Sequence, residues 1–365
     1  MSTQDDPTAP PTTASIITVA AGAMLLGVVL ILLVSDQPAA SVRAFLLGPF
    51  DGTFQIGTML ARAVPYTFTG LAVALGFRAG VFNIGAEGQL YLGALAGTAV
   101  ALTVPLPGPA LIVASLGAAA VAGGLYGFLP GILRARWATN EIVTTLMLNF
   151  VAVLFVSWVV SGPLLDPGGL GFPQTAFLPD SARLPRFLPL SSAHLGLVIG
   201  ILVCIAGHWL LTRTTLGYDM RIAGDNPAFL RYGGRSPQRA ITASMALGGA
   251  MAGLGGIAVV MGEQGRLIDG FSTGYGFVGI LIALLAGNRP LVIPIAALFY
   301  AYLTSGAAVM ETVTDVPREV VTDPTRDARG ADPHLAATFP HVPDGAHRAY
   351  TVHAVGFRRC SHLHV

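Results

Sequence analysis

Lysine is absent from this sequence of 365 residues, in which all 20 basic residues are arginine. A P-loop ATPase needs a lysine on the β- and γ-phosphates, so the chain carries no such site, and Schiff-base chemistry at a lysine is excluded as well. No nucleophile, base and acid occur at a local spacing that suggests catalysis. We therefore expect neither an enzyme nor a cofactor in this chain.

Charge and cysteine are also scarce. Only 11% of the residues are charged and 53% are hydrophobic, whereas soluble proteins carry about 25% charged residues. The net charge of +1 gives no reason to expect nucleic acid as a partner. The two cysteines, Cys204 and Cys360, provide neither a disulfide framework nor a metal-ligand spacing. This composition predicts an all-α protein whose helices form a polytopic transmembrane bundle in the lipid bilayer.

Long uncharged runs alternate with polar segments along the chain. The first run, Ala14–Val34, has 21 residues, enough to cross about 30 Å of hydrocarbon. The polar segment Met1–Thr13 before it lacks a basic n-region, so it is interpreted as a disordered lead and not as a signal peptide. About nine spans are visible in all, and the other eight are expected at Val64–Phe77, Gln89–Pro107, Gly108–Leu133, Ile142–Leu165, Leu195–Thr212, Ala240–Met261, Gly276–Gly287 and Pro290–Met310.

The expected span Val64–Phe77 is short and leads into a glycine-rich polar segment, Arg78–Gln89. This pattern predicts a broken or re-entrant helix, because irregular backbone at membrane depth must lie against protein or a cavity. Ser35–Arg62 is interpreted as a loop with an interfacial helix, and the proline-rich Asp166–Ser192 as an extracytoplasmic loop. Close helix packing is indicated by small-residue pairs four positions apart, at Gly123-x-x-x-Gly127 and Gly249-x-x-x-Gly253.

Residues 213–239, here called the arginine-rich loop, contain five arginines and two aspartates between two uncharged runs. Each arginine at the centre of a bilayer costs roughly 2.5–3.5 kcal/mol, so this loop must lie in water. With the amino terminus inside, the inner loops hold nine arginines and the outer loops five, which favours a cytoplasmic location for the loop. An ordinary loop that obeys this charge rule would show the same excess.

Local signals within the arginine-rich loop predict a helix at Pro227–Tyr232. Asp225 or Asn226 can cap it, a proline suits its first position, and Gly233-Gly234 ends it. A helix of about two turns is not stable alone in water, where about 12–15 residues are marginal. We therefore expect docking onto another surface to order it.

Polar side chains near the expected helix starts form two groups. Asn83 and Glu87 sit where a helix would begin, with an amide oxygen able to cap it, and Asn140 and Glu141 repeat this arrangement. Such groups either cap helices at the cytoplasmic interface or line a central pathway or gate. Asn149, deeper in its span, fits a pathway role or a single interhelical hydrogen bond equally well. The candidate pathway or gate residues are Asn83, Glu87, Gln89, Asn140, Glu141 and Asn149.

Three motifs resemble the membrane permeases of bacterial ABC importers for simple sugars and nucleosides, nearest the nucleoside branch. They are FRAGVFNIGAEGQLYLGA (Phe77–Ala94), TNEIVTTLMLNF (Thr139–Phe150) and GYDMRIAGDNPAFLRYGG (Gly217–Gly234). The resemblance covers residues from about 14 to about 320. It implies a permease domain over 14–320 with about ten spans, in the bacterial plasma membrane.

The resemblance also implies a complex with several partners. The short helix would couple the permease to a separate ABC ATPase subunit, which hydrolyses ATP with Mg²⁺, while a second permease subunit, often a different chain, completes the membrane part. An extracytoplasmic substrate-binding lipoprotein would deliver the nucleoside or simple sugar. The residues that match the coupling stretch are Arg221, Ala223, Gly224, Asn226, Pro227, Tyr232 and Gly233.

One alternative is an autonomous secondary transporter driven by ions. It would need an intramembrane acidic relay, for which Glu87 and Glu141 are the candidates. Reconstitution without any partner separates the two hypotheses, because uptake driven by a proton or sodium gradient alone would refute the ABC assignment.

The pattern changes in the tail, residues 321–365. This segment contains six of the eight histidines and no apolar run long enough to span, where the family would place a last helix. A GC-rich gene read in a shifted frame would give such a composition, so we hypothesise a frameshift. A histidine-rich tail that binds metal is the alternative.

Overall fold

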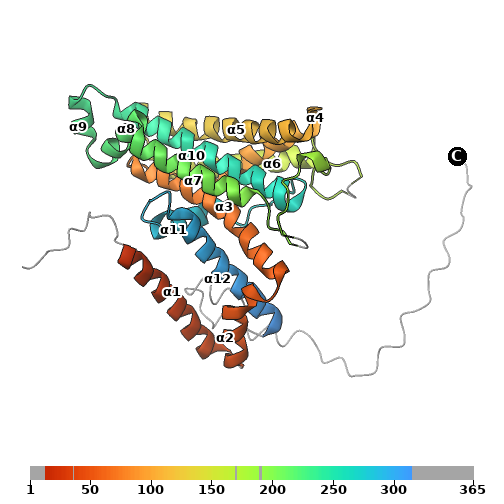
Figure 1. Cartoon of the computed structure of the whole chain (residues 1–365). Helices are drawn as coiled ribbons and strands as arrows, with labels where there is room; N and C mark the ends of the chain where they lie inside the picture. Colours follow the sequence, from red (N-terminus) through yellow and green to blue (C-terminus); the bar gives the residue numbers. More distant parts are fainter. Residues whose placement is uncertain (1–12, 36, 169–170, 189–190, 315–365) are drawn as a thin grey trace, which may run out of the picture. The chain divides into compact units, whose positions relative to one another are not determined.

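The computed structural model describes residues 13–35, 37–168, 171–188 and 191–314, all within the first of two compact units of the chain, Met1–Pro324 (Figure 1). The predicted lead, apart from Thr13, and the predicted tail, with its frameshift and metal-binding hypotheses, lie outside the described residues. The described residues form twelve α-helices and no β-strand. These are α1 (Thr13–Val34), α2 (Pro38–Leu47), α3 (Thr53–Arg78), α4 (Ala86–Thr103), α5 (Gly108–Trp137), α6 (Glu141–Ser161), α7 (Gly196–Arg213), α8 (Thr215–Asp225), α9 (Pro227–Tyr232), α10 (Pro237–Val259), α11 (Tyr275–Leu285) and α12 (Ile293–Val313).

Six of the described helices are long and apolar enough to cross a membrane. They are α3, α5, α6, α7, α12, and α10 together with its π-helical continuation η3 (Val260–Gln264). Shorter apolar segments are Thr18–Val34 in α1 and the whole of α11. The prediction of an all-α polytopic membrane bundle is confirmed.

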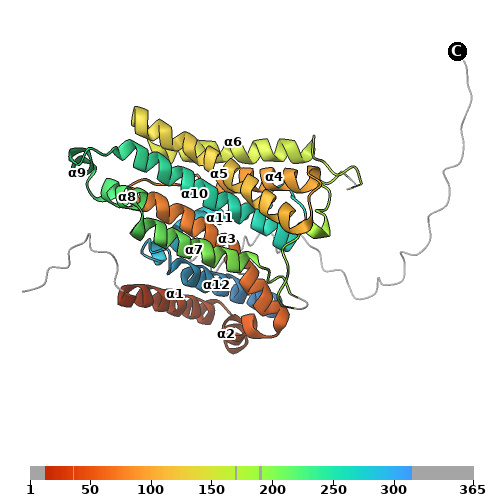
Figure 2. The same ribbon diagram turned by 45° about the horizontal axis from the view of Figure 1, so that its top comes forward.

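The centre of this unit is α10, which packs against α5, α3 and α4 (Figures 1 and 2). Helices α3 and α10 are the most enclosed of the spans, whereas α5, α6 and α7 bury less than a third of the residues in their most apolar stretch. Exposed side chains on those three helices include Leu125, Leu154, Trp158 and Leu202. Apolar side chains directed away from the bundle are what contact with lipid requires.

The approach of α5 to α10 is so close that backbone touches backbone. A Cβ atom built on Gly249 would overlap the carbonyl oxygen of Gly123, and one on Gly253 would overlap that of Ala119. Gly127 meets the carbonyl oxygen of Met245 in the same way. The two predicted small-residue pairs therefore pack against each other, which confirms their role in helix contact.

The expected short span at Val64–Phe77 is wrong, because α3 is a continuous helix of 26 residues. The charge of Arg62 interrupts the apolar pattern in the sequence, but its guanidinium donates a hydrogen bond to the carbonyl of Thr304 at 3.2 Å and so fits in the helix. The loop expected at Ser35–Arg62 is correspondingly shorter, although it does contain a helix, α2. Within the predicted irregular segment Arg78–Gln89, only residues 79–85 are not helical, and they are here called the α3–α4 turn.

The half-length helix of the bundle is α11, not the segment before the α3–α4 turn. Its 11 residues rise about 16 Å, half the thickness of the hydrocarbon layer. Arg78, at the end of α3, donates a hydrogen bond to the carbonyl of Asn288 at 3.0 Å, which places the end of α11 beside the end of α3. The start of α11 therefore lies partway along the bundle.

The proline-rich loop Asp166–Ser192 contains no α-helix in its described residues, as expected. It packs on the connection between α10 and α11, where the N–H of Thr175 donates to the carbonyl of Leu267 at 2.9 Å and that of Leu178 to Gly265 at 2.8 Å. This loop lies at the opposite end of α10 from α8 and α9 (Figure 1).

We predict that Gly249→Ala destabilises the protein, because the added Cβ must push α5 away from α10. Overpacking of this kind costs about 1–3 kcal/mol. Thermal unfolding of the full-length chain in detergent measures the effect. The matched control is Gly117→Ala on α5, where nothing lies within 4 Å of the new Cβ. Equal unfolding temperatures for the two variants would contradict the backbone contact.

Candidate functional site

The predicted helix of the arginine-rich loop is α9, with the expected bounds. Of the two proposed caps, Asn226 is the one used, because its Oδ1 accepts a hydrogen bond from the N–H of Phe229 at 3.0 Å. Helix α8 is capped by Thr214, whose Oγ1 accepts from the N–H of Gly217 at 3.1 Å. Asn226 alone separates the two helices, so the loop is a compact helix pair at one end of the bundle (Figure 2).

One buried side chain attaches α9 to the bundle. Leu230 packs with Ala223 of α8 and Ala240 of α10, and all three are buried. Arg235 and Asp219 form an ion pair at 2.7 Å that joins the segment after α9 to α8. The docking that a helix this short needs is thus provided by the chain itself.

The other side of α9 carries exposed aromatic side chains. Phe229 is 59% exposed and Tyr232 92% exposed. A shallow pocket of about 390 Å³ adjoins Tyr232, Arg231 and Ala228. Large aromatic rings left in solvent are typical of a surface that another protein covers.

The seven residues of the coupling stretch lie together on this helix pair. Gly224 lies against residues 78–80, and Ala223 is buried against Leu230 of α9. The others are Arg221 on α8, Asn226 and Pro227 at the start of α9, and Tyr232 and Gly233 at its end.

A contact between two glycines joins the helix pair to the α3–α4 turn. Gly80 has a φ of +73°, a conformation that favours glycine. A Cβ on Gly80 would lie 3.1 Å from the Cα of Gly224, and one on Gly224 would lie 2.6 Å from the carbonyl oxygen of Arg78. Backbone thus rests on backbone with no side chain between, so α8 cannot move toward the bundle without displacing the turn.

The α3–α4 turn leads into a buried polar cluster at the start of α4. The amides of Asn83 and Gln89 pair reciprocally, with N-to-O distances of 3.1 and 3.0 Å. Asn149 of α6 accepts from the N–H of Gly88 at 2.8 Å and donates to the carbonyl of Ile84 at 2.9 Å. All three side chains are buried. Asn149 thereby satisfies backbone groups at the turn, as buried irregular backbone requires.

Glu87 links the start of α4 to the start of α11. Its Oε2 accepts a hydrogen bond from the N–H of Gly276 at 2.6 Å. The Oγ of Ser272 accepts from the N–H groups of Gly274 and Tyr275 at 3.3 and 3.2 Å. The carboxylate therefore lies at two helix N-termini, where the backbone dipoles favour a negative charge.

Asn140 and Glu141 do not join this cluster. Asn140 is exposed and caps α6 by accepting from two backbone N–H groups at 3.0 and 3.4 Å, and Glu141 forms an ion pair with Arg134 at 3.2 Å. This geometry corresponds to the first of the two alternatives given for these residues, in which they cap a helix. The capping role expected of Asn83 is wrong, because its amide oxygen accepts from Gln89 and Gly85 precedes α4.

Sequence reasoning missed a group of tyrosines beside the start of α11. The ring of Tyr66 on α3 meets those of Tyr275 and Tyr300 edge to face, with centroids 5.7 and 5.1 Å apart. These residues come from α3, α11 and α12, so no local spacing in the sequence signals the contact.

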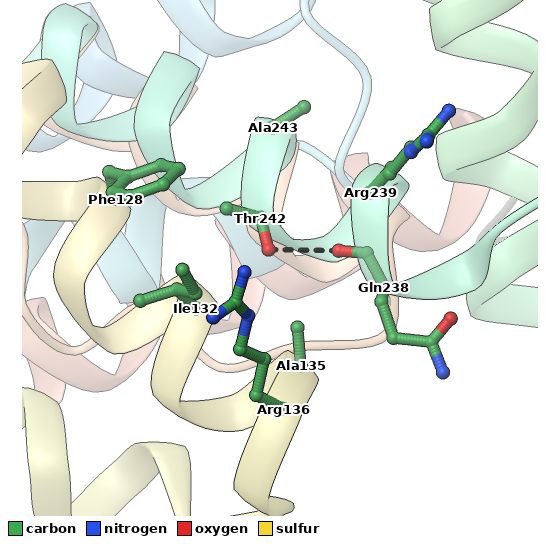
Figure 3. A pocket seen from close by; sticks show the side chains of 8 residues that line it. All are labelled: Phe128, Ile132, Ala135, Arg136, Gln238, Arg239, Thr242 and Ala243. Carbon is green, nitrogen blue, oxygen red and sulfur yellow. Dashed lines mark hydrogen bonds between the residues drawn. The ribbon is translucent and has the colours of Figure 1, made fainter.

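A groove of about 360 Å³ runs between α5 and α10 at the end of the bundle near α8 (Figure 3). Its lining is largely apolar and includes Phe128 and Ile132. Figure 3 shows the guanidinium of Arg136 directed toward Thr242, whereas that of Arg239 points away. Two arginines therefore line the groove, of which Arg136 is the one directed toward α10.

Spanning helices around a buried polar cluster and a half-length helix, with an exposed helix pair at one end, define a membrane transport protein of the helical-bundle class. The model of the family described as "Branched-chain amino acid transport system / permease component" matches residues 55–321. The chain belongs to this family of permeases.

Individual relatives agree with this assignment. The chain is 40% identical over 317 residues to the glucose ABC transporter permease protein TsgB13 of Haloferax volcanii, covering 84% of this chain and 83% of the relative. It is 37% identical over 320 residues to the guanosine ABC transporter permease protein NupP of Bacillus subtilis, covering 85% and 88%. The nucleoside ABC transporter permease protein NupB of Lactococcus lactis is 31% identical over 309 residues, covering 81% and 84%. This chain is a permease subunit of an ABC importer.

We predict that Asn149→Leu lowers the stability of the protein, because it leaves the N–H of Gly88 and the carbonyl of Ile84 without their partner. Each unpaired buried group costs about 1–3 kcal/mol. Asn149→Asp should be no milder, since it keeps the acceptor for Gly88 but buries a carboxylate against the carbonyl of Ile84. Thermal unfolding in detergent measures both variants, and Met147→Ala, at an exposed position of α6, is the control. If Asn149→Leu unfolds at the control's temperature, the cluster does not hold the turn.

Proposed function

We propose that this permease carries a nucleoside or a simple sugar across the bacterial plasma membrane. A separate ABC ATPase subunit hydrolyses ATP with Mg²⁺, a second and different permease subunit completes the path, and an extracytoplasmic lipoprotein delivers the ligand. Relatives named for glucose, guanosine and nucleosides support this choice of ligand class.

The observation that carries the proposal is the backbone contact between Gly80 and Gly224. It connects the exposed face of α9, where the ATPase docks on Phe229 and Tyr232, to the buried polar cluster. The α8–α9 end faces the cytoplasm, in agreement with the excess of arginine there. The proline-rich loop at the opposite end then faces the lipoprotein.

In this proposal, transport results when a displacement of α8 is passed through the α3–α4 turn to α4 and α11. Closure of the ATPase subunits displaces α8, and α8 displaces the α3–α4 turn on which it rests. The turn continues into α4, whose Glu87 holds the start of α11 through the N–H of Gly276. The start of α11 is the gate of the pathway, because a half-length helix held there by a carboxylate can tilt without breaking a span.

The geometry gives the alternative of an ion-driven secondary transporter little support. Glu87 is engaged at the start of α11, while Glu141 pairs with Arg134 at the end of α5. The two carboxylates that a relay would need therefore belong to separate parts of the described bundle. Ligand uptake by reconstituted permease in a proton or sodium gradient, with no ATPase present, would favour this alternative.

We predict that replacing Asn226 and Pro227 together by alanine and glycine uncouples ATP hydrolysis from transport. The double variant loses the cap of α9, which is worth about 0.5–2 kcal/mol, and the fixed first residue, so α9 no longer transmits displacement. Uptake in vesicles that contain the full complex should fall about tenfold or more, with unchanged membrane insertion and continued ATP hydrolysis. Normal uptake would count against the coupling role.

A second prediction concerns the contact with the ATPase. Phe229→Ala combined with Tyr232→Ala should reduce co-purification of the ATPase subunit, because buried aromatic anchors carry about 2 kcal/mol or more each at protein interfaces. Trp209→Ala is the control, since this ring is 61% exposed but lies on the spanning helix α7. Undiminished ATPase recovery with the double variant would place the docking surface elsewhere.

A further inference from the structure

A cavity of about 350 Å³ lies where α3, α7, α8 and the connection before α12 meet. Three arginines from three separate segments line it: Arg78 ends α3, Arg221 lies on α8, and Arg289 precedes α12. In the described part of the chain, none of these three arginines takes part in an ion pair. Positive charge is thus gathered here from segments far apart in the sequence.

The arginines are held in place but are not neutralised. Arg78 donates to the carbonyl of Asn288, and the Nε of Arg221 is buried without a hydrogen-bond partner among the described residues. The charges of Arg221 and Arg289 repel that of Arg78, and the carboxylate of Asp225 attracts it. Three cations against one nearby carboxylate leave a site that attracts an anion.

The rest of the cavity wall is largely apolar. It includes Leu211 of α7 and Pro290, Leu291 and Val292 before α12, of which Leu291 is 47% exposed. His208 and Thr212 of α7 complete the lining. The site therefore combines arginines with apolar residues at the ends of spanning helices, which is the depth of lipid headgroups.

We propose that this cavity binds the phosphate headgroup of an anionic phospholipid of the cytoplasmic leaflet. Guanidinium groups match phosphate oxygens in a two-pronged geometry, and the apolar wall covers the glycerol and the upper acyl chain. A soluble phosphate would meet the charges but leave the apolar wall in water. The leaflet named here rests on the proposed orientation of the permease, whereas binding itself does not depend on it.

The test is native mass spectrometry of the purified, delipidated full-length chain titrated with phosphatidylglycerol or with phosphatidylcholine. Phosphatidylglycerol should bind at least about fivefold more tightly, and Arg289→Gln should weaken its binding about fivefold, since each basic residue near a phosphate contributes at this level. Arg289→Gln is preferred to Arg78→Gln, because Arg78 also holds the connection before α12. Arg221→Gln provides a second, independent variant.

Arg136→Gln is the matched control, because it removes an arginine at the same end of the bundle from the groove of Figure 3. Its affinity for phosphatidylglycerol should equal that of the unaltered chain. Equal binding of the two lipids, or unchanged binding in Arg289→Gln and Arg221→Gln, overturns the proposal. Inorganic phosphate that binds as tightly as phosphatidylglycerol would assign the cavity to a soluble anion and overturn it too. Uptake assays of the same variants report separately on transport.

Discussion

Backbone polar groups inside a membrane bundle have no water to bind, and this constraint organises the interior of the permease. Helical backbone is interrupted at two places inside the described bundle, in the α3–α4 turn and before the start of α11. Asn149 forms hydrogen bonds with backbone groups at the first place, and Glu87 accepts one from the backbone N–H of Gly276 at the second. Polar residues that look functional in the sequence are therefore first of all required by the fold. Any motion of these segments has to exchange these hydrogen bonds for others, because breaking them outright would leave buried groups unpaired.

Close glycine contacts supply the stiffness that such a motion needs. Apolar side chains gain little by leaving lipid for protein, so helices in a membrane hold together by packing at short range. The contact of Gly123 with Gly249 locks α5 to α10, and that of Gly80 with Gly224 rests α8 on the turn. Long side chains at these places could change rotamer and absorb a displacement, whereas a backbone in contact with another backbone passes it on.

The features that the sequence predicted are those with local causes. The bounds of α9 follow from a cap, a proline and two glycines within a few residues, and the structure has the same helix. The start of α3 could not be predicted, because the charge of Arg62 is met by a carbonyl 242 positions away. The candidate pathway residues show the same limit. Glu87 and Glu141 occur in the same local sequence pattern, but only Glu87 contacts α11. The residue that it contacts, Gly276, lies 189 positions away in the sequence. From the sequence alone, each of these polar groups could therefore be predicted only as either an exposed helix cap or a buried residue of a pathway.

Within the α8–α9 pair, α9 is attached to the rest of the protein weakly and α8 strongly. Helix α9 is held by one buried leucine and by an ion pair with an exposed arginine, and such exposed pairs contribute about 0–1 kcal/mol. Helix α8, by contrast, rests on the α3–α4 turn through the glycine contact. The pair is therefore held to the bundle more firmly through α8 than through α9.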